Sequence, residues 1–147
     1  MDNFECIDST HVPQWDGEAD VIVIGLGAAG ACAAIEARQS GADVLVLERT
    51  SGGGGTTAMA AGHVYAGGGT PVQQATGFSD TSEAMFNYYM AVTPDPDEQK
   101  IRLYCDESVN HFNWLEAKGI PFNRSYYPYK NVYQPTDECL IWKKKKK

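Results

Sequence analysis

The chain has 147 residues, 43% of them hydrophobic, which is enough for one domain with a core of its own. Its formal net charge is −7, but five of the twelve basic residues are Lys143–Lys147, so the rest of the chain carries a net charge of −12. A body this acidic repels nucleic acids and anionic membranes, and we expect neither as a partner.

The start of the chain and the cysteines bear on the compartment. Residues 1–18 read as a polar, acidic arm without the apolar stretch of a secretory signal, and no apolar run later in the chain approaches the length of a membrane span. The cysteines lack the close pairs of a zinc or redox site, since they stand far apart at Cys6, Cys32, Cys105 and Cys139. They predict reduced thiols, no metal site and a cytoplasmic location.

Residues 19–50 predict a strand–helix–strand unit. Residues 19–24 end in an apolar, β-branched run that is typical of a parallel strand buried on both faces. Residues 28–40 are rich in alanine and predict a helix that ends at Gly41. Residues 43–47 predict a second buried strand. The fold class is therefore α/β, built on a βαβ unit.

The turn between the first strand and the helix has the spacing of a dinucleotide-binding fingerprint. Gly25 permits a tight turn, Gly27 lets the backbone approach a pyrophosphate, and Gly30 lets the helix pack closely on the strand. The helix N-terminus offers N–H groups and partial positive charge to the phosphates. Glu48 stands 23 positions after Gly25, near the spacing of about 20 residues for a carboxylate that binds ribose hydroxyls, and it disfavours NADP. The alternative, a glycine-rich turn with a surface glutamate, does not explain the strand, the helix and the acid together.

A second glycine-rich segment follows directly and bears on the choice between NAD and FAD. It opens with Gly52–Gly55 and two threonines, where an NAD dehydrogenase would proceed to its next helix. Small side chains let the main chain approach a longer ligand, and threonine hydroxyls can reach phosphate or ribitol, which favours FAD. Because apolar residues alternate with the glycines over residues 51–77, we do not expect a random linker, although a disordered loop is the alternative.

Two helices are predicted farther along the chain. Residues 81–92 form the first. The second helix is predicted to begin with Asp95 as its N-cap, Pro96 at its first position and the acidic Glu98 three residues after the cap. It is predicted to end with Gly119 as its C-cap. Its apolar positions keep a spacing of 3.6 residues and are Ile101, Tyr104, Cys105, Val109, Phe112 and Leu115. After Gly119 the sequence shows short aromatic stretches and no clear element.

These motifs resemble the FAD-binding domain of the fumarate reductase/succinate dehydrogenase flavoprotein family. The resemblance covers roughly residues 17–142 and rests on Gly25–Gly30, Glu48-Arg49, Gly54–Thr57 and Ala61-Gly62. Within the family, FAD-dependent 3-ketosteroid dehydrogenases of the Δ4-(5α) type look most similar, on the stretches "AGHVYAGGGTPVQ" and "YCDESVNHFNWLEAKGIPF". The resemblance implies a Rossmann-like FAD-binding domain and an FAD-dependent oxidoreductase.

The resemblance also implies a set of cofactor contacts. They come from the two glycine segments and the acid–arginine pair, at Gly25, Gly27, Ala28, Ala29, Gly30, Glu48, Arg49, Gly54, Gly55, Thr56, Thr57, Ala61 and Gly62. Some members attach the flavin covalently through a histidine in the segment where this chain has Thr56 and Thr57. His63 lies beyond that position, so noncovalent FAD is implied.

The sequence does not identify the residues of the reaction itself. Dehydrogenation beside a ketone needs an electrophile for the carbonyl oxygen, a base for the α-proton and a hydride acceptor. In the resembling enzymes the tyrosines that serve these roles come from later in the chain. Four tyrosines either line a pocket or, as we favour, pack or lie on the surface: Tyr126, Tyr127, Tyr129 and Tyr133. No histidine is expected to be catalytic, and His111 reads as a packed residue near the apolar face of its helix.

The chain is therefore expected to hold the N-terminal part of an FAD-binding domain, residues 19–142, truncated at its C-terminus and followed by a poly-lysine tail, residues 143–147. The parent reaction is expected to be dehydrogenation of a 3-ketosteroid or a similar small hydrophobic ketone. The alternatives are a fumarate reductase-like flavoprotein and a non-catalytic FAD-binding fragment. Without the catalytic part, we expect the chain alone to be inactive and marginally folded.

Overall fold

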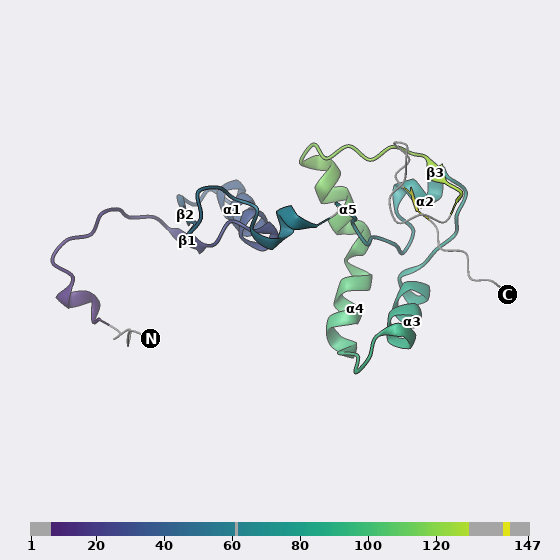
Figure 1. Cartoon of the computed structure of the whole chain (residues 1–147), viewed down its shortest axis with the longest axis horizontal. Coiled ribbons are helices and arrows are strands. Elements are labelled where there is room, and N and C mark those ends of the chain that lie inside the picture. The colour runs from purple at the N-terminus through teal and green to yellow at the C-terminus, as the bar shows by residue number, and fades with distance from the viewer. Residues whose placement is uncertain (1–6, 61, 130–139, 142–147) are drawn as a thin grey trace. The chain divides into compact units, whose positions relative to one another are not determined.

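The computed structural model describes residues 7–60, 62–129 and 140–141. The chain divides into two compact units, with the boundary between His63 and Val64 (Figure 1). The expected poly-lysine tail lies outside the described residues. No helix among the described residues is long and apolar enough to cross a membrane.

The first unit contains the predicted βαβ element. Strands β1 (Val21–Ile24) and β2 (Val44–Leu47) pair in parallel, and helix α1 (Ala28–Gln39) connects them. Two 3-10 helices complete the unit, η1 (Ser9–His11) in the N-terminal arm and η2 (Gly55–Met59) in the second glycine segment. The predicted strand–helix–strand order is confirmed, with each boundary within two residues of expectation.

Helix α1 packs against one face of the two-stranded sheet, and Gly30 permits this contact. A Cβ atom built on Gly30 would lie 1.9 Å from the carbonyl oxygen of Gly25 and 3.3 Å from Cγ1 of Val23. Both distances are shorter than van der Waals contact, so only glycine allows the helix to approach the strand this closely. The prediction that Gly30 lets the helix pack closely on the strand is therefore confirmed.

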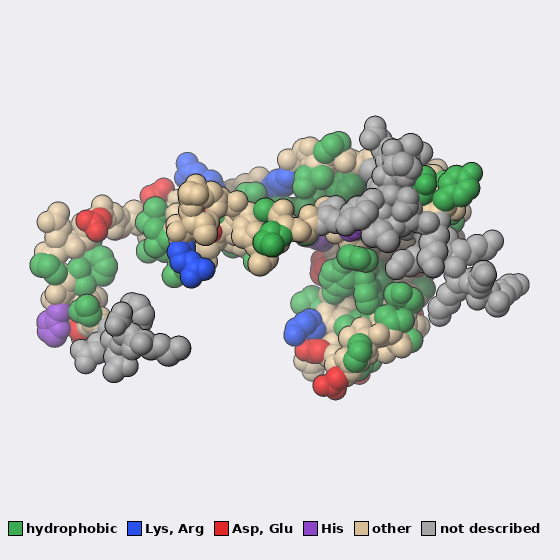
Figure 2. Space-filling model, viewed as in Figure 1, with side chains coloured by type: hydrophobic (Ala, Val, Ile, Leu, Met, Phe, Trp, Pro, Cys, Tyr) green, Lys and Arg blue, Asp and Glu red, His purple; other side chains and the backbone are tan. Residues whose placement is uncertain are grey.

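The opposite face of the sheet differs from expectation. Val23 is buried, but the side chains that alternate with it stay exposed, at 56% for Ile22, 85% for Ile24, 40% for Leu45 and 48% for Leu47. The sequence predicted strands covered on both faces, and this is wrong for the described chain. Both faces of the strands carry apolar residues, as in a sheet that is buried on both sides. In the described chain α1 covers only one of these faces, so the apolar side chains of the other face stay exposed to solvent. Figure 2 shows hydrophobic side chains at the surface of both units.

The second unit is mainly helical. It consists of α2 (Pro71–Ala75), α3 (Ser82–Val92), α4 (Glu98–Asp106) and α5 (Ser108–Ala117), with short strands β3 (Tyr126–Tyr127) and β4 (Leu140–Ile141). Helices α3 and α4 lie side by side (Figure 1). Their contact holds the core of the unit, in which Met85, Phe86 and Cys105 are buried and Tyr89, Met90 and Ile101 pack around them. The predicted helix over residues 81–92 is confirmed.

The long helix predicted after Asp95 begins later than expected and is divided into two helices. Its N-cap is Asp97, whose Oδ1 accepts the N–H of Lys100 at 3.0 Å, while Asp95 takes a φ of 49° that does not suit a cap. The helix bends at Glu107 into α4 and α5, and the buried Ser108 follows at the bend. The C-cap is Lys118, one residue before the predicted Gly119, which follows it with a φ of 90°.

The aromatic stretch after Gly119 contains an element that the sequence did not predict. Strand β3 pairs in parallel with β4, with Tyr126 opposite Leu140 and Tyr127 opposite Ile141. Two residues are too few for a period-two pattern, and the pairing joins segments that are distant along the chain. Local sequence therefore carries no signal for it.

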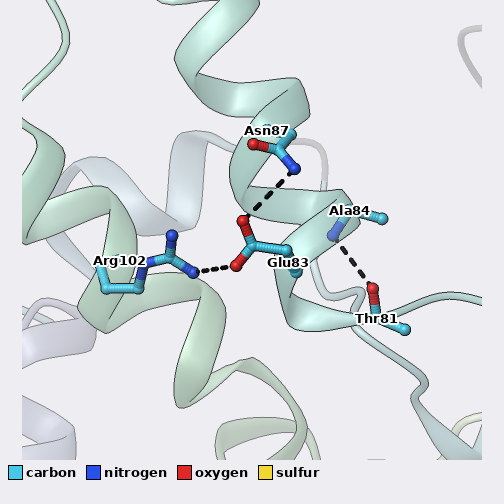
Figure 3. Close-up of polar contacts among 5 residues, drawn as sticks. All are labelled: Thr81, Glu83, Ala84, Asn87 and Arg102. Atoms are coloured by element: carbon cyan, nitrogen blue, oxygen red, sulfur yellow. Dashed lines mark hydrogen bonds and ion pairs between the residues drawn. The ribbon is translucent and has the colours of Figure 1, made fainter.

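An ion pair and a stacked guanidinium link α3 to α4. Glu83 accepts from Nη1 of Arg102 at 2.7 Å and from the Asn87 amide at 3.4 Å, while the Thr81 hydroxyl caps α3 through the Ala84 N–H (Figure 3). The Arg102 guanidinium also lies 3.4 Å from the ring centroid of Phe86. The hydrogen bond from Arg102 lowers the pKa of the Glu83 carboxyl, but Glu83 is exposed and Arg102 only partly buried, so the ion pair stabilises the unit little.

Replacing Gly30 with alanine should lower the free energy of unfolding by about 3 kcal/mol, because the new methyl group must displace the Gly25 carbonyl and the start of α1. Urea unfolding followed by circular dichroism measures this. Gly17→Ala is the matched control, since nothing lies within 4 Å of its Cβ position, and it should change the free energy by less than about 0.5 kcal/mol. Equal stability of the two variants would contradict the close approach.

Candidate cofactor-binding site

The carboxyl ends of β1 and β2 meet at one edge of the sheet, where the predicted site residues gather. Strands of a parallel pair end on the same side, and ligands of α/β proteins bind beyond that side. Gly25 begins the turn there, with a φ of 93°, and its N–H donates to the Leu47 carbonyl oxygen at 2.7 Å. The turn thus starts from the sheet itself.

The N-terminus of α1 presents main-chain donors at this edge. Gly27 is the N-cap and supplies no side-chain hydrogen bond. Within the described part of the chain, the N–H groups of Ala29 and Gly30 have no hydrogen-bond partner, and the first bond of the helix runs from Ala31 N–H to the Gly27 carbonyl at 2.9 Å. Two donors at a twelve-residue helix end are therefore available to an anion.

Glu48 closes the site from the end of β2. Its Oε2 accepts the N–H of Leu26, in the glycine turn, at 2.7 Å, and its Oε1 accepts the N–H of Thr50 at 2.9 Å. These bonds, that with Leu26 first, hold the pKa of the Glu48 carboxyl at about 2. The carboxylate is charged at neutral pH, half-buried, and bridges the ends of the two strands.

The second glycine segment folds back onto the first. The Gly54 N–H donates to the Leu26 carbonyl oxygen at 2.6 Å, and the Thr57 hydroxyl accepts the N–H of Ala28 at 3.3 Å. Gly54 has a φ of 114°, and a Cβ on it would lie 2.8 Å from that of Ala58. The structure thus brings both glycine segments and Glu48 to one edge, and the expectation of an ordered segment rather than a random linker is met.

The remaining predicted residues contribute less. Arg49 and Thr56 are exposed, and Gly62 has a φ of 78° in open space. Ala61 lies outside the described residues. Sequence reasoning missed Leu26, whose main chain joins Glu48 to Gly54, and Thr50. The sequence gives no signal for either residue. Leu26 acts through main-chain groups, which do not depend on its side chain, and a threonine two positions after an acidic residue is common.

The glycines of the second unit have a different role. The N–H groups of four consecutive residues are all accepted by side chains: Gly67 by Ser108 at 3.0 Å, Gly68 by Asp80 at 2.9 Å, and Gly69 and Thr70 by Oε1 of Gln73 at 3.0 and 2.9 Å. The side chains of Thr70, Gln73 and Ser108 are buried. This turn has no N–H left for a ligand and is a structural junction.

The tyrosines singled out in the sequence lie in and after strand β3 as far as the structure describes them. Tyr126 and Tyr127 are half-buried, Tyr129 is exposed, and Tyr133 lies outside the described residues. His111 is exposed and its ring stacks on Trp114, with centroids 6.2 Å apart, so the expectation of a packed histidine is wrong. No cluster of three metal-binding side chains occurs among the residues the structure describes.

A pair of tyrosines packs between α3 and α4, and the sequence named only Tyr104, as an apolar position of its helix. The rings of Tyr89 and Tyr104 lie 5.8 Å apart, and the Tyr104 hydroxyl donates to the Tyr65 carbonyl oxygen. Burial raises the pKa of Tyr89 to about 12, and burial also raises that of Tyr104. Both are protonated at neutral pH, which suits packing and a hydrogen bond to the main chain.

Replacing Glu48 with glutamine should make thermal stability less dependent on acid pH. Folding lowers the pKa of Glu48 from 4.5 to about 2, so the carboxylate stabilises the folded state fully above about pH 4.5, and this contribution is lost as the pH falls through about 2. The difference in Tm between the wild type and Glu48→Gln should be full at neutral pH and shrink between about pH 4.5 and 2. A difference independent of pH would show that the charge is not involved.

Three comparisons place the chain among known proteins. A family model described as FAD binding domain matches residues 20–139. The 3-oxo-5-alpha-steroid 4-dehydrogenase of Comamonas testosteroni is 40% identical over 137 residues, 92% of this chain and 25% of its own length. The fumarate reductase (cytochrome) of Shewanella frigidimarina is 35% identical over 101 residues, 68% of this chain and 18% of its own length.

A solved structure is also similar. It is the crystal structure of 3-ketosteroid-delta4-(5alpha)-dehydrogenase from Rhodococcus jostii RHA1 in complex with 4-androstene-3,17-dione. The TM-score is 0.85 at 52% sequence identity, over 91% of this chain and 28% of that chain. The chain thus spans about a quarter of the length of these steroid dehydrogenases. The predicted resemblance and the predicted cofactor, FAD, are confirmed.

Proposed function

Because the chain belongs to the FAD binding domain family, we propose that the edge formed by Gly25–Gly30, Glu48 and Gly54–Thr57 holds the adenosine diphosphate half of FAD in a Rossmann-like manner. The observation that carries this proposal is that the charged Glu48 carboxylate is bound to the Leu26 N–H in the same turn that leads to the N–H groups of Ala29 and Gly30, which have no acceptor among the described residues. The carboxylate can accept hydrogen bonds from ribose hydroxyls, and the N–H groups can donate hydrogen bonds to phosphate oxygens. We extend the domain over residues 19–142, with residues 1–18 as an arm.

The helix end fits the pyrophosphate. Ala29 and Gly30 offer two N–H groups with the partial positive charge of α1 behind them. A Cβ atom on Gly27 would lie 3.9 Å from the Gly54 carbonyl oxygen, an ordinary van der Waals contact, so the second glycine segment lies against this part of the turn. The acidic body of the protein does not prevent phosphate binding at the helix end, because charges beyond about 8 Å are screened at physiological salt.

The second glycine segment fits a longer ligand than NAD. Gly54 and Thr57 tie it to the turn after β1, so that main chain without bulky side chains continues beyond the pyrophosphate site. Thr56 and Thr57 stand where other members carry a linking histidine. We therefore infer that the contacts of Arg49, Thr56, Ala61 and Gly62 with FAD are noncovalent.

Replacing Glu48 with alanine should weaken FAD binding by about 1–3 kcal/mol, because the ribose hydroxyls lose their acceptor and the Leu26 N–H loses its partner. Equilibrium dialysis with flavin fluorescence measures the Kd. Glu18→Ala removes the same charge from the exposed arm and should leave the Kd unchanged. Unchanged affinity of Glu48→Ala would exclude the residue from the site, and flavin that stays with acid-precipitated protein would contradict noncovalent binding.

We propose that the whole protein is an FAD-dependent dehydrogenase of a 3-ketosteroid or a similar small hydrophobic ketone. Its similarity to two steroid dehydrogenases, one of them bound to a steroid, supports this choice. Bound FAD would supply the hydride acceptor. The described chain contributes cofactor contacts, and we assign it no catalytic residue. Reduced cysteines support a cytoplasmic location and the acidic body argues against nucleic acid, and both stay predictions.

The whole protein should reduce an electron-accepting dye when a 3-ketosteroid is added, because bound FAD would accept a hydride from the steroid and the dye would take up the two electrons. Dye bleaching measures this rate. The second candidate, fumarate reduction, is favoured by the Shewanella frigidimarina relative. It predicts that fumarate oxidises a reduced dye in the presence of the protein, and this outcome without steroid activity would replace the steroid proposal.

A further inference from the structure

Thr50 lies between two acceptors that it cannot serve at once. Its Oγ1 is 2.9 Å from Oε1 of Glu48 and 2.7 Å from the carbonyl oxygen of Gly52. The Glu48 carboxylate is ionised and a carbonyl has no proton, so neither acceptor can donate in return. The hydroxyl carries one proton and therefore bonds to one of the two at a time.

The acceptor capacity of Glu48 makes this choice matter. A carboxylate offers about four acceptor positions. The Leu26 N–H takes one on Oε2, and the Thr50 N–H takes one on Oε1. When the Thr50 hydroxyl donates to Oε1 as well, one position is left. A ribose carries two vicinal hydroxyls, so it needs one position more than the carboxylate then has.

Among the donors that the described residues place on Glu48, the Thr50 hydroxyl also lies within hydrogen-bond distance of a second acceptor. The Leu26 and Thr50 N–H groups are fixed by the main chain, whereas rotation about one bond carries the hydroxyl proton to Gly52. We propose that Thr50 is a positioning residue: its hydroxyl holds Glu48 in place in the free protein, and transfers its hydrogen bond to Gly52 when both ribose hydroxyls of FAD bind Glu48. This inference rests on the proposed function of the same edge.

The transfer links the ribose to the second glycine segment. Gly52 opens that segment, and a Cβ on the next residue, Gly53, would lie only 2.6 Å from Cδ2 of Leu26. Gly54 then donates to the Leu26 carbonyl. A hydrogen bond from Thr50 to the Gly52 carbonyl oxygen would thus stabilise the part of the segment that packs on the glycine turn when the cofactor is bound.

The test compares two ligands that differ by one hydroxyl, ADP and 2′-deoxy-ADP. With ADP, both ribose hydroxyls bind Glu48 and Thr50 donates to Gly52, while with 2′-deoxy-ADP one position suffices and Thr50 stays on Glu48. The amide nitrogen of Gly53 is bonded to the Gly52 carbonyl carbon, so its ¹⁵N chemical shift reports the change. Spectra of the full chain are recorded with saturating ligand, which also stabilises the fold.

The wild type should show a Gly53 shift that differs between the two ligands. Thr50→Val removes the hydroxyl but keeps the Thr50 main-chain N–H on Glu48, so the difference should vanish, and Thr50→Ser should restore it. Thr50→Ala replaces the valine variant if that variant does not fold.

Three outcomes would overturn the inference. A ligand-dependent shift that persists in Thr50→Val would come from the ligand directly, and no difference in the wild type would mean that Glu48 does not take both hydroxyls. In either case ADP still binds, so the proposed function would stand. Failure of both ligands and of FAD to bind would remove the proposed function and this inference together.

Discussion

The hydrogen bond from the Leu26 N–H to Glu48 is the interaction on which the first unit depends. It joins the turn after β1 to the residue after β2, so two segments 22 positions apart are held at one edge of the sheet. The Leu26 carbonyl accepts from Gly54 on its other side, which places the second glycine segment against the same peptide. One residue with an apolar side chain therefore organises the site through its main chain, and its side chain packs against the Gly53 position.

The depressed pKa of Glu48 follows from this arrangement and serves it. Two main-chain N–H groups point at the carboxylate, which favours its charged form. A charged carboxylate accepts hydrogen bonds in all its positions and donates none, so it suits ribose hydroxyls and repels a 2′-phosphate. The hydrogen bonds that stabilise the turn therefore also keep charged the group that we propose accepts the ribose hydroxyls.

The sequence predicted what depends on residue type and spacing. The glycines at 25 and 30, the acid at 48 and the strand–helix–strand order are visible because each has a steric or chemical requirement that few residues meet, whereas the structure shows no such requirement at Gly27. The N-cap was misplaced because Asp95 and Asp97 carry the same cap-forming side chain, and only their backbone angles distinguish them. The β3–β4 pair and the roles of Leu26 and Thr50 arise from contacts that no local pattern encodes.

The two glycine-rich turns show why composition alone does not identify a ligand site. Both have small residues, positive φ angles and closely packed main chain. At Gly67–Thr70, buried side chains of the same unit accept all four N–H groups, so the turn ties helices together. At the start of α1, the N–H groups of Ala29 and Gly30 lack a partner among the described residues, and an anion can accept them. Whether a glycine-rich turn can bind a ligand therefore depends on whether neighbouring side chains already accept its N–H groups.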